Sequence, residues 1–168
     1  MALFTIGYES ITPIQLVDEL RRHRIRTVID VRQNPISRKP GFSRTALSEH
    51  LQRAGVQYEH ASVFGCPRAI RNDYKTSGDW TVYQVEYAAY LQSLDAALSA
   101  LSRRAQRERC VLLCFEANPQ FCHRSLVAAK AAQLAEGTLA ITHLVTSAQV
   151  QAARRYDRLA HAAGNTPR

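Results

Sequence analysis

Three consecutive residues, Cys122-His123-Arg124, bring a thiol, an imidazole and a guanidinium together. We expect them in the first turns of a helix that begins near Asn118-Pro119, because proline suits the first helical turn. Free N–H groups and the positive end of the helix dipole favour a thiolate there and also bind anions. Cys122 is therefore a candidate nucleophile, His123 a candidate for proton transfer, and Arg124 a candidate anion ligand.

Two other interpretations of Cys122 remain open. Leu126 and Ala129 follow it at spacings of four and three residues, which is typical of a helix face packed in the core. Alternatively, Cys114, Cys122 and His123 could bind a metal ion. Their C-x7-C-H spacing matches no common structural zinc motif, and adjacent residues on a helix point about 100° apart. We therefore assign no metal ligand from the sequence, and the residues do not identify a cofactor.

Two carboxylates, Asp30 and Glu116, lie at the ends of two predicted strands. If the strands are neighbours, these groups could share a proton or divide acid and base roles. Several arginines lie close to them in the sequence, which favours an acid–arginine network that holds a substrate. The candidate substrate-binding or anion-binding residues are Tyr8, Arg32, Ser37, Arg38 and Arg124.

The charge of the chain favours an anionic partner. The net charge is +8, the isoelectric point is about 9.7, and 19 of the 22 basic residues are arginine. Residues 32–75 hold eight basic and three acidic side chains, interleaved with aromatic residues. This pattern suits a single-stranded nucleic acid, a flipped base or a phosphorylated small molecule. The alternative is a solvated basic surface with aromatic rings buried beneath it.

Strand and helix signals alternate along the chain. We expect strands over residues 3–8, 27–32, 56–61, 109–115 and 139–145. Helices are expected after Thr12, Ser43, Asp79, Asn118 and Thr146, and the periodicity predicts one long helix from Asp79 to about residue 101. This order predicts an α/β fold, a three-layer Rossmann-like sandwich whose mostly parallel sheet has helices on both faces. Polar residues that follow the strands should then converge in one cleft.

Length and composition indicate one folded domain over residues 1–168, with a frayed tail at 164–168. No apolar run approaches the roughly 20 residues of a membrane span, so we expect no membrane partner. The first residues lack the basic start and apolar stretch of a signal peptide. We therefore expect a cytoplasmic protein with reduced cysteines.

Several of these segments together resemble a bacterial and archaeal family, the domain of unknown function 488. They are Thr5-Ile6-Gly7-Tyr8, Asp30-Val31-Arg32 with Pro35, Ser37 and Arg38, Phe42-Ser43, Leu113-Cys114 with Glu116 and Pro119, and Cys122-His123-Arg124. The resemblance extends from about Leu3 to about Val145. It implies a compact α/β fold and a shared site built from these segments. Phe64-Gly65-Cys66 stands where the family usually has Leu-Gly-Gly.

Two classes of function fit these residues. The first is an enzyme that acts on a nucleotide, a nucleoside or a nucleic-acid end, with Cys122, His123, Glu116 and Asp30 as catalytic candidates. The second is a binding module for a phosphorylated ligand or nucleic acid that changes no bond. The sequence lacks a P-loop and the G-x-S-x-G and H-E-x-x-H motifs. The adjacent thiol, imidazole and guanidinium favour the enzyme, whereas the diffuse basic segment favours the binding module.

Overall fold

A five-stranded, all-parallel sheet forms the centre of the protein, as the computed structural model describes it over residues 1–152. The strand order is β3-β2-β4-β1-β5. Their bounds are β1 Ala2–Gly7, β2 Thr27–Asp30, β3 Gln57–His60, β4 Cys110–Cys114 and β5 Ala140–Leu144. This confirms the predicted α/β fold. The end of the last predicted helix and the tail at 164–168 lie outside the described residues.

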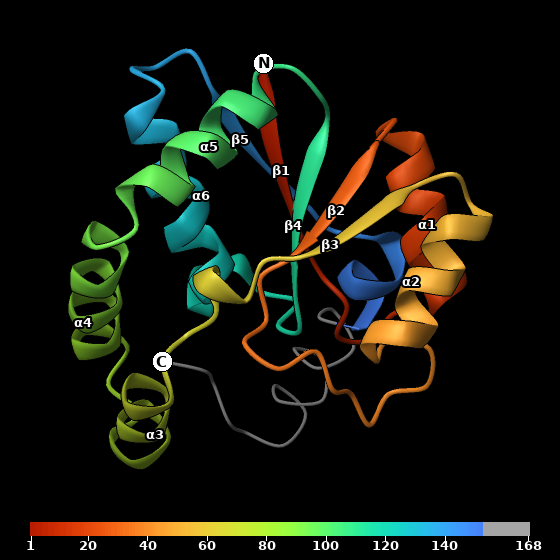
Figure 1. Ribbon diagram of the computed structural model, residues 1–168. Helices are drawn as coiled ribbons and strands as arrows, with labels where there is room; N and C mark the ends of the chain where they lie inside the picture. The colour runs from red at the N-terminus through yellow and green to blue at the C-terminus, as the bar shows by residue number, and fades with distance from the viewer. Residues whose placement is uncertain (153–168) are drawn as a thin grey trace.

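Helices cover both faces of the sheet, which makes three layers (Figure 1). Helices α1 (Pro13–Arg22) and α2 (Arg44–Arg53) lie on one face. On the other face lie α5 (Asp95–Ala105) and α6 (His123–Leu134), with α4 (Trp80–Gln92) packed outside them and α3 (Arg68–Ser77) beyond its end. Within residues 1–152, no helix is both long enough and apolar enough to cross a membrane.

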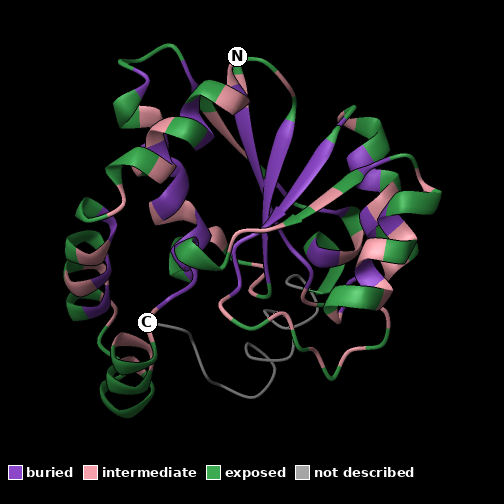
Figure 2. Cartoon of the chain, in the orientation of Figure 1, coloured by how far each residue is buried: buried purple, intermediate pink, exposed green. Residues whose placement is uncertain are grey.

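The residues of β4 alternate between two hydrophobic cores. Cys110, Leu112 and Cys114 pack in the core with α4, α5 and α6, whereas Val111 and Leu113 pack in the core with α1 and α2. All five are buried, as Figure 2 shows for the central strands. Burial on both faces explains why the sequence of β4 is a continuous apolar run. Because side chains alternate along a strand, Cys114 is directed toward the α6 side of the sheet.

Capping residues predicted from the sequence set the starts of α1 and α4, but the end of the helix after Asp79 differs from the prediction. Thr12 and Gln15 form the predicted capping box at α1, and the Asp79 carboxylate accepts from two backbone N–H groups at the start of α4. The predicted long helix after Asp79 is instead two helices, α4 and α5. The Ser93 hydroxyl donates to the carbonyl of Tyr90 at 2.7 Å, which competes with helical hydrogen bonding at the break.

Gly7, the last residue of β1, allows the loop after β4 to lie directly on the sheet edge. A Cβ atom at this position would lie 1.7 Å from the carbonyl oxygen of Glu116. The backbone of Tyr8 and Glu9 also donates to the carbonyls of Cys114 and Phe115, at 3.1 and 2.8 Å. The absence of a side chain at Gly7 therefore decides where Glu116 can sit.

We expect Gly7→Ala to lower the free energy of unfolding by about 3 kcal/mol, because the methyl group would collide with backbone that cannot rotate away. Urea denaturation measures the change. Gly55→Ala is the matched control: its Cβ meets nothing within 4 Å, so only the backbone strain at φ +73° remains, about 1 kcal/mol. Equal losses for the two variants would contradict this account of Gly7.

Candidate functional site

The Cys122-His123-Arg124 segment begins a helix later than the sequence predicts. Asn118 caps only a 3-10 turn, Pro119–Phe121, by accepting from the N–H of Gln120 at 2.9 Å. Cys122 then adopts an extended backbone, with φ −137° and ψ 133°, and is the N-cap of α6. The expected continuous helix from Asn118 is therefore wrong. The Cys122 side chain precedes the first helical turn instead of lying on a helix face.

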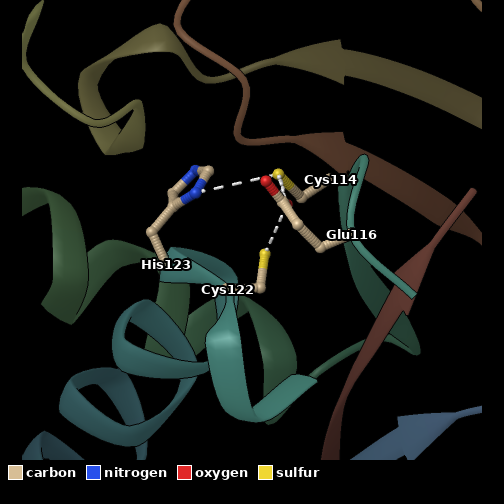
Figure 3. Close-up of side chains that lie close together, drawn as sticks. All are labelled: Cys114, Glu116, Cys122 and His123. Atoms are coloured by element: carbon tan, nitrogen blue, oxygen red, sulfur yellow. Dashed lines mark hydrogen bonds between the residues drawn. The ribbon is translucent and has the colours of Figure 1, made fainter. Parts of the chain in front are cut away.

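Four ligand-type side chains converge where β4 ends and α6 begins (Figure 3). The thiols of Cys114 and Cys122 both donate to Oε2 of Glu116, each at 3.0 Å. Nδ1 of His123 lies 3.7 Å from Sγ of Cys114. One donor atom from each of the four residues lies within 4.8 Å of the others. We call these four residues the thiol cluster.

The two thiols of the cluster have opposite pKa shifts. Burial raises the pKa of Cys122, but the hydrogen bond with Cys114 and the positive charges of His123 and Arg124 outweigh it, so its pKa is well below the usual value. The hydrogen bond with Cys122, together with burial, raises the pKa of Cys114. Burial and the negative charge of Cys122 raise the pKa of Glu116. A negative charge in the cluster is therefore favoured on Cys122.

Arg124 lies beneath the cluster and is completely buried. Its Nη1 donates to the carbonyl of Glu116 at 2.6 Å, its Nη2 to the carbonyl of Ala117 at 3.1 Å, and its Nε to the hydroxyl of Thr5 at 3.4 Å. Among residues 1–152, no acidic side chain forms an ion pair with it. The guanidinium thus holds the loop after β4 against β1.

A second buried polar group lies at the end of β2. Arg32 binds the Asp30 carboxylate through two hydrogen bonds, from Nε at 2.8 Å and from Nη2 at 2.5 Å. The hydroxyl of Tyr58 donates to the same carboxylate at 2.8 Å. Nη1 of Arg32 donates to the hydroxyl of Tyr8 and to the carbonyl of Phe42, both at 2.9 Å. Asp30 therefore pairs with an arginine and not with Glu116.

One cavity of about 760 Å³ opens between the two groups, beyond the carboxyl ends of β1, β2 and β4. Six of the nine site residues expected from the sequence line it: Tyr8, Arg32, Ser37, Arg38, Glu116 and His123. The other three do not: Asp30, Cys122 and Arg124 are completely or almost completely buried behind the lining. A cavity of this size is typical of small-ligand sites.

The cavity also has lining residues that were not among the nine site residues expected from the sequence. Cys114 reaches it from the end of β4, and α3 and the start of α4 contribute Arg71, Tyr74, Lys75, Trp80 and Tyr83. The position of Cys114 at a strand end was the signal available for it. Tyr74 and the two cations belong to the basic segment, but nothing in the sequence separates them from its solvated members.

Comparison with known proteins places the chain in a family. Residues 13–131 match the model of a family described as Domain of unknown function DUF488. The chain belongs to this family. No curated protein and no solved structure matches the chain. The matched range includes the thiol cluster and α3, and every lining residue of the cavity except Tyr8 lies within it. The family description names no reaction, and the chemistry of the cavity is the basis for the function proposed below.

We expect Asp30→Asn to destabilise this DUF488 domain by about 3 kcal/mol, since it leaves the buried charge of Arg32 without its counter-charge. Urea denaturation followed by circular dichroism measures the loss. Glu49→Gln breaks an exposed ion pair with Arg53 and should cost less than about 0.5 kcal/mol. A loss for Asp30→Asn as small as that of the control would contradict a structural role for the buried pair.

Proposed function

We propose that this protein is an enzyme that binds a nucleotide, a nucleoside or a nucleic-acid end in the cavity beyond β1, β2 and β4. One observation carries the proposal: cations, aromatic rings and proton-transferring groups line the same cavity. Phosphate, base and a reacting bond are the three features of such a substrate that these groups match.

Helix α3 supplies the cations that are best placed for phosphate. Arg71, Tyr74 and Lys75 line the cavity at positions i, i+3 and i+4, which share one helix face. Nε of Arg71 is buried and has no hydrogen-bond partner in the described part of the chain. A buried donor without a partner is costly, and an anionic oxygen would satisfy it. Arg38, which is exposed, adds positive charge on the opposite wall.

Aromatic rings with accessible surface line the same walls. Phe115 and Phe121 are 44% and 52% exposed, which is unusual for phenylalanine. Trp80 stacks on Tyr83 at 4.7 Å between ring centroids and meets Phe121 edge-on at 5.8 Å. Such rings stack with nucleobases regardless of base identity. They support an aromatic ligand over a simple phosphate.

The floor of the cavity favours an enzyme over a binding module. Cys114, Glu116 and His123 reach the cavity with a thiol, a carboxyl and an imidazole, which are groups that transfer protons. Cys122 lies directly behind them, with its Sγ 3.0 Å from Oε2 of Glu116. Asp30 does not line the cavity. It accepts two hydrogen bonds from Arg32 and thereby holds this guanidinium at the cavity wall. A site that only binds a ligand does not require a thiol, a carboxyl and an imidazole that can transfer protons.

Calorimetric titration with nucleosides, nucleoside monophosphates and short single-stranded oligonucleotides tests the binding step. We expect Arg71→Gln to weaken binding of the phosphorylated probes about tenfold or more, because a charged hydrogen bond is lost. Affinity for oligonucleotides should also fall as salt rises. Arg68→Gln is the matched control on the same helix, since Arg68 is exposed and does not line the cavity. Absence of binding for every probe would contradict the proposal.

Mass spectrometry of each bound probe after incubation distinguishes the enzyme from the binding module. We expect product with the wild type, and product formation about 100-fold slower or more with Glu116→Gln at similar affinity. A ligand that binds tightly and returns unchanged under all conditions would favour the binding module.

A further inference from the structure

We propose that Cys114, Cys122, His123 and Glu116 bind one zinc ion at the floor of the cavity. Zinc is the metal best matched to two thiolates, an imidazole and a carboxylate within one small, buried group. The cluster offers these donors within 4.8 Å of one another. This proposal does not depend on the identity of the ligand in the cavity. With zinc bound, Cys114 and His123 are ligands, and Glu116 is the lining group left to transfer protons once it leaves the ion.

The distances suit tetrahedral coordination after a small expansion. With metal–ligand bonds of about 2.0–2.3 Å, neighbouring ligand atoms in a zinc tetrahedron lie about 3.3–3.8 Å apart. The separation of Sγ of Cys114 from Nδ1 of His123 is 3.7 Å and lies within that range. The two sulfur-to-oxygen separations of 3.0 Å are shorter, because a proton lies between each sulfur and the carboxyl oxygen of Glu116. Replacing these protons by a metal ion would move each pair apart by roughly half an ångström.

The orientation of His123 is that of a metal ligand. Its Nε2 lies 3.0 Å from the carbonyl oxygen of Val31, which can only accept, so Nε2 carries the proton and donates. When a metal ion displaces the proton of Nδ1, this nitrogen presents a lone pair toward the thiol cluster. The ring is almost completely buried and meets Tyr87 edge-on at 5.7 Å between centroids. A backbone carbonyl that orients the ring in this way is the usual second partner of a metal-bound histidine.

Adjacent ligands are compatible with one ion here because Cys122 is not helical. The 100° rotation between neighbouring residues applies within a helix. Cys122 has extended backbone as the N-cap, and His123 is the first helical residue. Both side chains consequently point toward Glu116 and Cys114, as Figure 3 shows. The objection raised by the C-x7-C-H spacing therefore does not hold in the folded chain.

Arg124 completes the charge balance of such a site. Two thiolates and one carboxylate carry three negative charges, and a zinc ion carries two positive charges, which leaves one negative charge. Arg124 is a completely buried cation that hydrogen-bonds to the carbonyl of Glu116 and forms no ion pair within residues 1–152. Buried charges are normally compensated. The loaded cluster and Arg124 together are neutral.

Glu116 is the ligand that could yield its place to a substrate. It is the one partly exposed member of the cluster, and it lines the cavity together with Cys114 and His123. Two thiolates and one imidazole would remain on the ion if the carboxylate moved away. Three protein ligands and one exchangeable position are the arrangement of catalytic zinc sites.

Elemental analysis of protein purified without added metal is the first test. We expect about one zinc per chain in the wild type and less than about one tenth in Cys114→Ala and Cys122→Ala. Cys110→Ala is the matched control, because Cys110 is buried in the same strand as Cys114 but lies outside the cluster. It should retain the metal. Metal that is retained in both cluster variants would overturn the proposal.

Cobalt binding to the wild-type apoprotein tests the site without any variant. After removal of metal by a chelator, Co²⁺ should give the visible bands of a tetrahedral ion and a sulfur-to-cobalt charge-transfer band, and Zn²⁺ should displace it. Either ion should raise the melting temperature by about 5 °C or more. An apoprotein that takes up neither ion would refute the site. So would the loss of two free thiols to a Cys114–Cys122 disulfide in freshly purified, unreduced protein.

Discussion

A completely buried guanidinium with no ion pair in the described chain holds together the edge of the sheet that borders the cavity. Arg124 donates to two consecutive carbonyls of the loop after β4 and to Thr5 in β1. The loop can lie this close to the strand because Gly7 has no side chain. Glu116 is fixed at the end of β4 in consequence, and both thiols of the cluster donate to its carboxylate. Loss of this contact would release the loop and disperse the thiol cluster.

The position of β4 between β1 and β2 explains why two buried polar groups flank one cavity. Strand order changes direction there, and crevices form beyond such points in parallel sheets. Because successive side chains of a strand point to opposite faces of the sheet, the two buried polar groups lie on different faces. Asp30 and Tyr58 lie with the core beneath α1 and α2, whereas Cys114 and Cys122 lie with the core beneath α4, α5 and α6. The first group holds Arg32 rigidly, and the second contains the thiols and the carboxyl group on which the proposed enzyme activity depends.

The long connection between β3 and β4 forms the wall of the cavity that is best suited to recognise a ligand. Helix α3 has no buried residue in its whole length, so its side chains are free to serve the cavity or the solvent. The start of α4 adds stacked aromatic rings. In the proposed function, the sheet and its loops position the reactive groups, whereas α3 and α4 supply the residues that select the ligand. Helices that carry little of the core can change their surface without loss of the fold.

The alternation of apolar runs and capping residues was sufficient to predict the parallel α/β fold, because each signal acts within a few residues: Thr12 with Gln15, or Asp79 with the next two N–H groups. The same pattern placed the candidate site residues at the ends of β1, β2 and β4. Only the tertiary structure decided which of these side chains face the cavity. Cys122 and Arg124 are buried, and the 3-10 turn Pro119–Phe121 delays the start of α6, so that Cys122 is an extended N-cap residue. Arg124 donates to the carbonyls of a loop seven and eight residues earlier. Helical periodicity does not reveal where a helix begins when a short 3-10 turn precedes it. Four ligands from a strand end, a loop and a helix cap formed no recognisable spacing until the chain was folded.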